Sequence, residues 1–242
     1  MEMIPLVTEN SETHELQLKG FAERKWAESQ NLCHLTTLLI PIFPDRSIQI
    51  QVRYKIKSFP GCRDIFGGHV ELDQEFWPFL LGSPFDLKKI IVTAGAREAN
   101  EELRIINSKT GYPHILQEKD IHQVGNIGEF KWESSGNFER STLFLVPIPN
   151  NCITYPMDNI EKIFYPVEKE SQSFIEINHM FHNHPQYAYK DRVIAKKAGY
   201  EKNKANWQFA DGAARFLENK NLSEKITQAI DNLPSEVFQS PE

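Results

Sequence analysis

The chain of 242 residues has few cysteines and no long apolar run. Its three cysteines, Cys33, Cys62 and Cys152, are odd in number and lack a Cys-x-x-Cys spacing, which argues against a disulfide framework and a zinc ribbon. No stretch approaches the roughly 20 apolar residues of a membrane-spanning helix. The N-terminus also lacks a basic region followed by an apolar run. We therefore expect a reduced, cytoplasmic protein that does not enter a membrane.

An excess of basic residues is absent as well, because 27 Lys and Arg face 33 Asp and Glu, for a net charge of −6. Proteins that bind nucleic-acid polymers regardless of sequence need a basic surface. We expect no such partner, although a nucleotide remains open as a small-molecule ligand. A hydrophobic content of 40% is enough for a packed core. The length suits one substantial domain with an appendage, or two small ones.

Carboxylates are concentrated in the segment Arg97–Leu103, with the sequence REANEEL. On a helix, Glu98, Glu101 and Glu102 project along one edge, because residues three and four apart share a face. Such close like charges favour a hard divalent cation between them. An apolar stripe with helical spacing, flanked by these acids, predicts the face that packs on the core: Val92, Ala96, Ala99, Leu103 and Ile106. A solvated helix whose acids have no function is the alternative.

A glycine pair, Gly67-Gly68, precedes His69, Val70 and Glu71 upstream of this helix. Glycine lets the backbone approach a ligand closely. A backbone carbonyl there can join a carboxylate cluster as another hard oxygen ligand. The two segments together therefore predict a magnesium site suited to diphosphate chemistry.

These segments resemble the signature of the Nudix hydrolases, a loop-helix-loop that binds metal. The resemblance implies that Gly68, Glu98, Glu101 and Glu102 ligate Mg²⁺, or Mn²⁺ in its place. It also implies that Arg97, Glu98, Glu101 and Glu102 form the catalytic set, with Arg97 bracing the loop.

Three details depart from the Nudix pattern. The first glutamate of the signature falls on Gln74, with Glu75 one place late, and Arg104 replaces a glycine after the helix. The third departure is an insertion at about residues 75–92. By the family's pattern, the bracing partner of Arg97 is Glu71.

A wider resemblance extends over residues 4–170, to the Nudix branch that contains isopentenyl diphosphate isomerase. Residues 19–43 of this chain, KGFAERKWAESQNLCHLTTLLIPIF, resemble the first part of the proteins of that branch. The resemblance implies an α/β (α+β) fold, a Nudix-type α/β/α sandwich with a mixed sheet, in a domain of residues 1–170. We expect a helical C-terminal extension, residues 171–242, packed on that domain. Alternation and turn residues predict the strands 35–43, 48–55, 67–72, 122–130, 142–148 and 160–166.

The implied activity is Mg²⁺-dependent hydrolysis of a diphosphate linkage in a nucleoside diphosphate linked to another moiety. The substrate partner is thus a small-molecule diphosphate. The general base stays open among the helix glutamates and Glu133, Asp158 and Glu161. One alternative is a Nudix-like module that binds a nucleotide without cleaving it.

The other alternative is an isomerase of five-carbon diphosphates. His34 and His69 resemble two of the histidines that hold the additional metal of the isopentenyl isomerases, while Ala27 stands where another is expected. In that branch a cysteine supplies the catalytic acid, and the matching position here is Gly67. Glycine cannot transfer a proton, so this alternative is the weaker one.

Two apolar segments lie outside the signature. The insertion contains Phe76, Trp77, Phe79, Leu80, Leu81 and Phe85, which we expect mainly to anchor it, although one ring could stack on a base. Two apolar stripes with helical spacing near the C-terminus predict helices that cap the sheet. One stripe contains Phe209, Ala213, Phe216 and Leu217, and the other contains Ile226, Ile230 and Leu233. The alternatives for these helices are that they form the contact of a homodimer or that they form a wall of the substrate pocket. We expect His179, His182 and His184 to lie in a solvated loop without metal.

Overall fold

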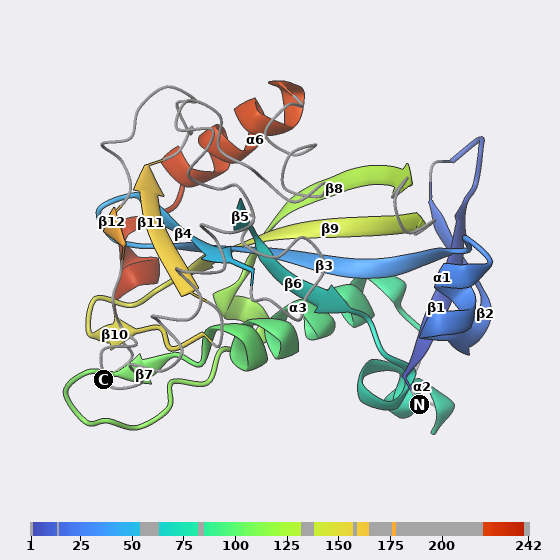
Figure 1. The fold of residues 1–242 in the computed structure, drawn as a ribbon, viewed down its shortest axis with the longest axis horizontal. Coiled ribbons are helices and arrows are strands. Elements are labelled where there is room, and N and C mark those ends of the chain that lie inside the picture. The colour runs from blue at the N-terminus through green and yellow to red at the C-terminus, as the bar shows by residue number, and fades with distance from the viewer. Residues whose placement is uncertain are drawn as a thin grey trace. The chain divides into compact units, whose positions relative to one another are not determined.

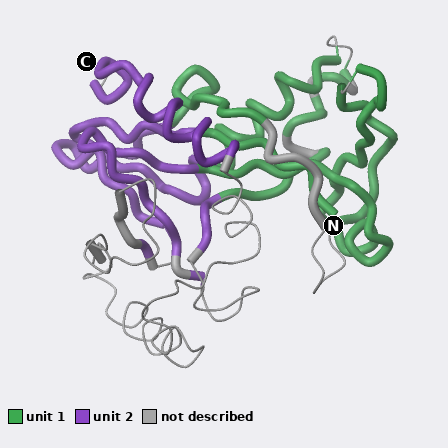
Figure 2. Tube along the Cα trace, turned by 90° about the horizontal axis from the view of Figure 1, so that it is seen from above, with its two compact units in different colours: residues 1–39, 67–98, 116–144 green, residues 40–66, 99–115, 145–242 purple. Residues whose placement is uncertain are grey.

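The computed structural model describes residues 2–13, 15–53, 63–81, 85–131, 138–156, 159–164, 176–177 and 220–239. The chain divides into two compact units, shown in Figure 2. Unit 1 comprises Met1–Leu39, Gly67–Glu98 and Leu116–Phe144, and unit 2 comprises Ile40–Phe66, Ala99–Ile115 and Leu145–Glu242. The chain crosses between the units several times, so each unit is built from segments far apart in the sequence.

Unit 1 begins with an antiparallel pair, β1 (Met3–Glu9) and β2 (Leu16–Glu23), followed by helix α1 (Arg24–Ser29). Figure 1 shows these three elements together. Strand β3 (Cys33–Ile42) pairs with β1 through Leu6 and His34. It also pairs with β6 (Phe66–His69) and β9 (Phe138–Pro147), and β9 pairs with β8 (His122–Lys131). Almost every residue of β3 is buried, as expected of a strand with neighbours on both sides.

Helix α3 (Leu87–Leu103) carries the acidic segment. It starts after Asp86, whose side chain accepts hydrogen bonds from the backbone N–H groups of Lys88 and Lys89, at 3.0 and 3.2 Å. Within unit 1 its backbone packs directly on β9, because a Cβ added at Gly95 would lie 2.9 Å from the Phe144 ring. The predicted helix and its buried stripe are confirmed for Ala96, Ala99 and Leu103.

The end of this helix differs from the prediction in one respect. Ile106 lies in the short strand β7 (Ile106–Asn107), because the helix stops at Leu103 and Arg104 adopts a left-handed conformation with φ of +46°. Ile106 therefore does not extend the helical stripe. Ile105 and Leu116 are the buried residues that follow the helix.

The insertion forms a π-helix, η1 (Leu72–Phe76), a short helix α2 (Trp77–Leu80) and the start of α3. Phe76 is buried and contacts Phe21 edge-on, with ring centroids 4.8 Å apart. Trp77, Leu81 and Phe85 are exposed. The expectation that most of the apolar side chains anchor the insertion thus holds for Phe76 and does not hold for Trp77 and Leu81. The Phe85 ring is exposed, but it packs against the rings of Phe76 and Phe79, with centroids 6.3 and 5.8 Å apart.

Unit 2 contains β4 (Ser47–Val52), which pairs antiparallel with β5 (Arg63–Asp64) and with β11 (Asn159–Phe164). Strand β11 also pairs with β12 (Glu176–Ile177), and β7 pairs with β10 (Cys152–Ile153). The C-terminal elements are α6 (Lys220–Asp231) and the 3-10 turn η5 (Ser235–Phe238). As predicted, Ile226, Ile230 and Leu233 are buried.

Arg46 attaches the C-terminal helix to the turn between β3 and β4. Its guanidinium donates to the carbonyl oxygens of Ile230, at 2.6 Å, and Leu233, at 2.9 Å, and lies over the Phe238 ring. A cation at the carboxyl end of a helix satisfies carbonyl groups that have no partner within the helix. The left-handed conformation of Arg46, with φ of +66°, belongs to the tight turn itself, in which the Arg46 N–H donates to the Phe43 carbonyl and the Phe43 N–H donates to the Ser47 carbonyl, each at 2.9 Å.

The mixture of strands and helices confirms the α+β class, and all six predicted strands exist. Strand β6 ends at His69, earlier than predicted, because η1 begins at Leu72. Among the described residues, no helix is both long enough and apolar enough to cross a membrane. Several predicted features lie outside the described residues, namely the three histidines at 179–184 and the stripe of Phe209 to Leu217.

Candidate functional site

Gly68 and Glu98 are in contact within unit 1. A Cβ placed on Gly68 would lie 2.3 Å from the carboxyl carbon and both carboxylate oxygens of Glu98. Only a residue without a side chain lets the backbone of β6 approach this carboxylate so closely. Glu98 itself is buried, with 6% of its surface exposed. The structure thus brings together one residue from each of the two segments that the sequence singled out.

Gly67 has a different reason to be glycine. Its φ of +149° is unusual for other residues, and a Cβ would lie 2.0 Å from the backbone oxygen of Thr37. A backbone atom cannot move aside as a flexible side chain can. No side chain, including that of a cysteine acid, fits at position 67 in this backbone.

Arg97 connects β6, η1 and α3. It donates from Nε to Glu75 Oε1 at 2.5 Å, from Nη1 to Glu98 Oε1 at 2.8 Å, and from Nη2 to the backbone oxygen of His69 at 2.8 Å. The predicted pair with Glu71 is present at 3.7 Å, but it is longer than these three contacts. Arg97 therefore fixes both the Glu98 carboxylate and the loop that follows the glycine pair.

Glu75 is the partner of Arg97 that the sequence analysis missed. Its side chain is 1% exposed, and Oε2 accepts a hydrogen bond of 2.6 Å from the backbone N–H of Glu71. Burial raises the pKa of Glu75, while the hydrogen bonds from Arg97 and Glu71 act in the opposite direction.

The π-helix η1 explains why Glu75 stands one place later than the Nudix pattern requires. A π-turn contains an additional residue compared with an α-turn. That residue moves Glu75 into reach of Arg97. The sequence did contain a signal for Glu75, since this acid directly follows Gln74. The fixed spacing of the Nudix signature, however, does not reveal a π-turn.

Glu101 and Glu102 lie on the last turn of α3, three and four residues after Glu98. Glu101 is exposed and Glu102 is half-buried. Of the proposed general bases outside the helix, Glu133 and Asp158 lie outside the described residues. Glu161 is in β11, and its side chain is outside the described part.

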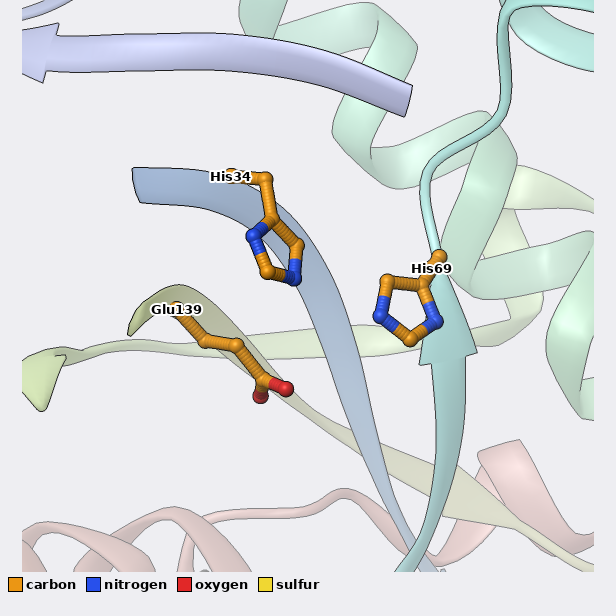
Figure 3. A group of neighbouring side chains, drawn as sticks. All are labelled: His34, His69 and Glu139. Atoms are coloured by element: carbon orange, nitrogen blue, oxygen red, sulfur yellow. The ribbon is translucent and has the colours of Figure 1, made fainter. Parts of the chain in front are cut away.

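A second group of ligand-type side chains comes from three strands of unit 1. His34 of β3, His69 of β6 and Glu139 of β9 each offer one atom, and these atoms lie within 4.8 Å of one another. Figure 3 shows the three side chains pointing into one region, and the two imidazole rings are stacked with centroids 5.2 Å apart. Glu139 was not predicted, because a partner on a distant strand has no local spacing signal.

The histidines of this group are in the form that binds metals. His34 Nδ1 lies 2.9 Å from the carbonyl oxygen of Leu32, so Nδ1 carries the proton and Nε2 keeps its lone pair. The Nε2 atoms of His34 and His69 are buried without a hydrogen-bond partner. Burial lowers the pKa of both, for His69 with help from Arg24, so both are neutral at pH 7. Two neutral imidazoles and a carboxylate suit a divalent transition metal.

Other polar groups surround these residues. Thr36 Oγ1 donates to Glu139 Oε2 at 3.4 Å and shares a hydrogen bond of 2.7 Å with Ser141. Arg24 forms ion pairs with Glu2, at 3.1 Å, and with Glu28, at 2.8 Å. Ala27, which stands where the isomerase resemblance expects a third histidine, is fully buried.

No family model and no curated protein matches the chain. Solved structures do resemble it, including DR0079 from Deinococcus radiodurans, with 18% identity over 67% of this chain and 83% of that chain, at a TM-score of 0.37. A NUDIX hydrolase from Alicyclobacillus acidocaldarius has 13% identity over 47% of this chain and 68% of its own, at a TM-score of 0.33. An Ap4A hydrolase from C. elegans has 10% identity over 82% of this chain and 99% of its own, at a TM-score of 0.34.

Nudix hydrolases, the class that the sequence resembles, are therefore among the structures to which the chain is similar. The identities are at most 18% and the TM-scores at most 0.37 for these three.

Proposed function

We propose that the chain is a Mg²⁺-dependent hydrolase of the Nudix type, which cleaves a diphosphate linkage in a nucleoside diphosphate linked to another moiety. The observation that carries this proposal is the contact between the Gly68 backbone and the buried Glu98 carboxylate. This contact places the backbone of β6 at Gly68 beside a carboxylate of α3. Carboxylate and backbone carbonyl oxygens are the kinds of ligand that a hard cation takes.

Gly68, Glu98, Glu101 and Glu102 would hold the cation, and Mn²⁺ could replace Mg²⁺ on the same oxygen ligands. Of this set, the Glu98 carboxylate stands against the Gly68 backbone, and Glu101 and Glu102 follow three and four residues later in the sequence of the same helix. Among the described residues, the group of three ligand-type side chains that lie close together is a different one, His34, His69 and Glu139. The cation would supply charge neutralisation of the phosphates and activation of water for attack at phosphorus.

Arg97 acts on this site by positioning. Its 2.8 Å hydrogen bond holds the Glu98 carboxylate, and its bond to the His69 carbonyl holds the chain next to Gly68. Glu75 in turn holds Arg97 from the buried side. A network of this kind keeps a metal ligand in one orientation.

The group of His34, His69 and Glu139 favours one alternative, the isomerase, because two of its members match the additional metal site of that branch. Gly67 argues against it, since the backbone of Thr37 leaves no room for the side chain of an acid there. We therefore assign the histidine group no catalytic step.

A substrate panel tests the proposal and separates it from the nucleotide-sensing alternative. Purified full-length protein is incubated with Mg²⁺ and, in turn, nucleotide sugars, dinucleoside polyphosphates, nucleoside triphosphates and isopentenyl diphosphate. The products are identified by chromatography and ³¹P NMR. Hydrolysis of a nucleoside diphosphate linked to another moiety is the expected result. Tight binding of a nucleotide without cleavage would favour the sensor, and isomerisation of isopentenyl diphosphate would overturn the assignment.

A further inference from the structure

Two imidazole nitrogens of unit 1 are buried without a hydrogen-bond partner, Nε2 of His34 and Nε2 of His69. His34 is 0% exposed, and the side chain of His69 is 10% exposed. A buried polar atom without a partner costs about 1–3 kcal/mol. Two such atoms in one group therefore call for a ligand that satisfies both of them.

The other nitrogen of each ring is placed as it is in metal sites. His34 Nδ1 donates to the Leu32 carbonyl oxygen at 2.9 Å. His69 Nδ1 lies 3.7 Å from a carboxylate oxygen, Glu2 Oε1. Histidines that bind a metal characteristically turn their second nitrogen to a carbonyl or a carboxylate, which directs the first nitrogen at the ion. Both rings are thus arranged to present Nε2 as the ligand atom.

Glu139 completes the group with a carboxylate from β9, as Figure 3 shows. The residue is 8% exposed, and Thr36 Oγ1 donates to its Oε2 at 3.4 Å. Strand β3 is hydrogen-bonded to both β6 and β9, so the three ligands stand on neighbouring strands of one sheet. Ligands on paired strands are held more precisely than ligands on loops.

The charges around the group favour a cation. Arg24 and Arg97 are the cations that act on the histidines. Each of these arginines is itself paired with two carboxylates: Arg24 with Glu2 and Glu28, and Arg97 with Glu75 and Glu98. Because Glu139 adds a further carboxylate, the surroundings attract a positive ion despite the two guanidinium groups.

The ligand types select the kind of ion. Two imidazoles and one carboxylate suit a divalent transition metal such as Zn²⁺, whereas Mg²⁺ prefers oxygen ligands. The histidine group and the acids of α3 are therefore suited to different ions. Because no side chain fits at position 67, an ion in the histidine group has no acid beside it from that position.

His69 connects this group to the residues of the proposed hydrolase. It directly follows Gly68 on β6, and its backbone carbonyl accepts a hydrogen bond of 2.8 Å from Arg97 Nη2. Arg97 Nη1 also donates to Glu98 Oε1 at 2.8 Å. An ion on the His69 ring would thus hold, from its other side, the same residue that Arg97 holds by the carbonyl.

We infer that His34, His69 and Glu139 form a site for one divalent transition-metal ion, for which Zn²⁺ is the best match. The ion fixes the side chain of His69, and with it the end of β6 beside Glu98. Occupation of this site therefore strengthens Mg²⁺ binding at α3. The effect on Mg²⁺ rests on the proposed function, whereas the binding of zinc does not.

Calorimetric titration of Zn²⁺ into full-length protein that has been freed of metal tests the site. An excess of Mg²⁺ is present to occupy the acids of α3. One zinc ion per chain is expected to bind. His34→Gln and Glu139→Gln should each weaken zinc binding at least about 100-fold, since even residues that only orient a ligand contribute about 10–100-fold. The matched control is His114→Gln, a half-buried histidine after α3, which should bind zinc as the wild type does.

A crystal structure of the zinc-loaded wild type gives a readout that needs no variant to fold. Anomalous scattering at the zinc edge should place the ion between His34, His69 and Glu139. The inference is overturned if no zinc binds in the presence of Mg²⁺, if both ligand variants bind as the wild type does, or if the ion lies elsewhere.

The effect on Mg²⁺ has a test that needs no turnover. Mg²⁺ is titrated into wild type with and without one equivalent of Zn²⁺, and zinc should raise the Mg²⁺ affinity about tenfold, a typical size for coupling between two sites. Arg97→Lys should still bind zinc, but its Mg²⁺ affinity should not respond, because lysine lacks the fork that holds both the His69 carbonyl and Glu98. A merely structural ion would raise the Tm of both proteins and leave the wild-type Mg²⁺ affinity unchanged, which would overturn the positioning role.

Failure of the zinc site and failure of the proposed function give different results. Zinc binding in a protein that hydrolyses no diphosphate would contradict the proposed function and keep the zinc site. Mg²⁺-dependent hydrolysis in a protein that binds no zinc would contradict the zinc site and keep the proposed function.

Discussion

At the scale of single residues, the two adjacent glycines of β6 serve different purposes. Gly67 is required by the backbone itself, because the oxygen of Thr37 occupies the space of its side chain. Gly68 is required by the Glu98 carboxylate, which Arg97 holds in place but which, as the end of a side chain, shifts at a lower cost than a backbone atom does. One glycine therefore belongs to the fold, and the other belongs to the site.

Substitution of each glycine by alanine should separate these roles. Gly67→Ala should lower the free energy of unfolding by about 3 kcal/mol, because a backbone clash and a strained φ must both be relieved. Gly68→Ala should change it by less than about 1 kcal/mol, but should reduce turnover at least about 100-fold by displacing Glu98. Urea denaturation and a hydrolysis assay measure the two effects. Equal stability of the two variants would contradict this account.

The sequence predicted the part of the site that follows helical spacing. Glu98, Glu101 and Glu102 are on α3 as expected, and Gly68 contacts Glu98. Glu75 was missed because the π-turn of η1 adds a residue that the spacing of the signature does not include.

At the scale of elements, the end of α3 departs from the Nudix pattern without losing its shape. Arg104 has the left-handed φ of +46° that glycine adopts at little cost. The backbone thus follows the conformation that a glycine would take, although the residue is arginine. Among the described residues, Arg104 is exposed and no side-chain hydrogen bond or ion pair compensates for this conformation.

Two arginines with positive φ give a matched pair of substitutions. Arg104→Gly should stabilise the protein by about 1 kcal/mol, because it relieves left-handed strain and removes no side-chain hydrogen bond or ion pair with the described residues. Arg46→Gly should destabilise it by about 2 kcal/mol, because the guanidinium that caps α6 is lost. Thermal denaturation of both variants provides the comparison. The account is wrong if Arg104→Gly is the less stable of the two.

The sequence could predict elements better than their ends. The strands and α3 followed from alternation and helical spacing, but the assignment of Ile106 to the helix was wrong. The end of the helix at Leu103 could not be predicted from Arg104, since arginine usually favours helix interiors and seldom adopts the left-handed conformation. The tertiary environment decides the boundary there.

At the scale of the whole molecule, the division into two units was not visible in the sequence. The chain enters each unit three times, so no linker or change of composition separates them. The predicted domain of residues 1–170 and its C-terminal extension, the homodimer and the cytoplasmic location stay predictions. Glu139 could not be predicted either, because the residues of the histidine group lie on strands that are far apart in the sequence.

The stability of the molecule should fall in mild acid. The pKa values of His34 and His69 lie below the ordinary 6.5 in the folded state, so below pH 6.5 the unfolded chain binds more protons. The free energy of unfolding should therefore decrease as the pH falls from 6.5 toward the folded pKa values, by up to about 1.4 kcal/mol per pH unit for each histidine. The charged groups around the pair are Arg24, Arg97 and the carboxylates of Glu2, Glu28 and Glu139.

Urea denaturation at pH 7.5 and pH 5.5, in buffer with EDTA, measures this dependence. A His34→Gln variant removes one of the titrating groups, so it should lose less stability between the two pH values than the wild type does. An equal loss in both proteins would show that His34 does not contribute.

The most direct test of the central claim is the rate of Mg²⁺-dependent diphosphate hydrolysis in wild type, Glu101→Gln and Glu12→Gln. Glu12 is an exposed acid in the turn before β2 and serves as the matched control. We predict that EDTA abolishes hydrolysis, that Glu101→Gln lowers the rate at least about 100-fold, and that Glu12→Gln has no effect. Hydrolysis that persists in EDTA, or at an unchanged rate in Glu101→Gln, would contradict a metal site on α3.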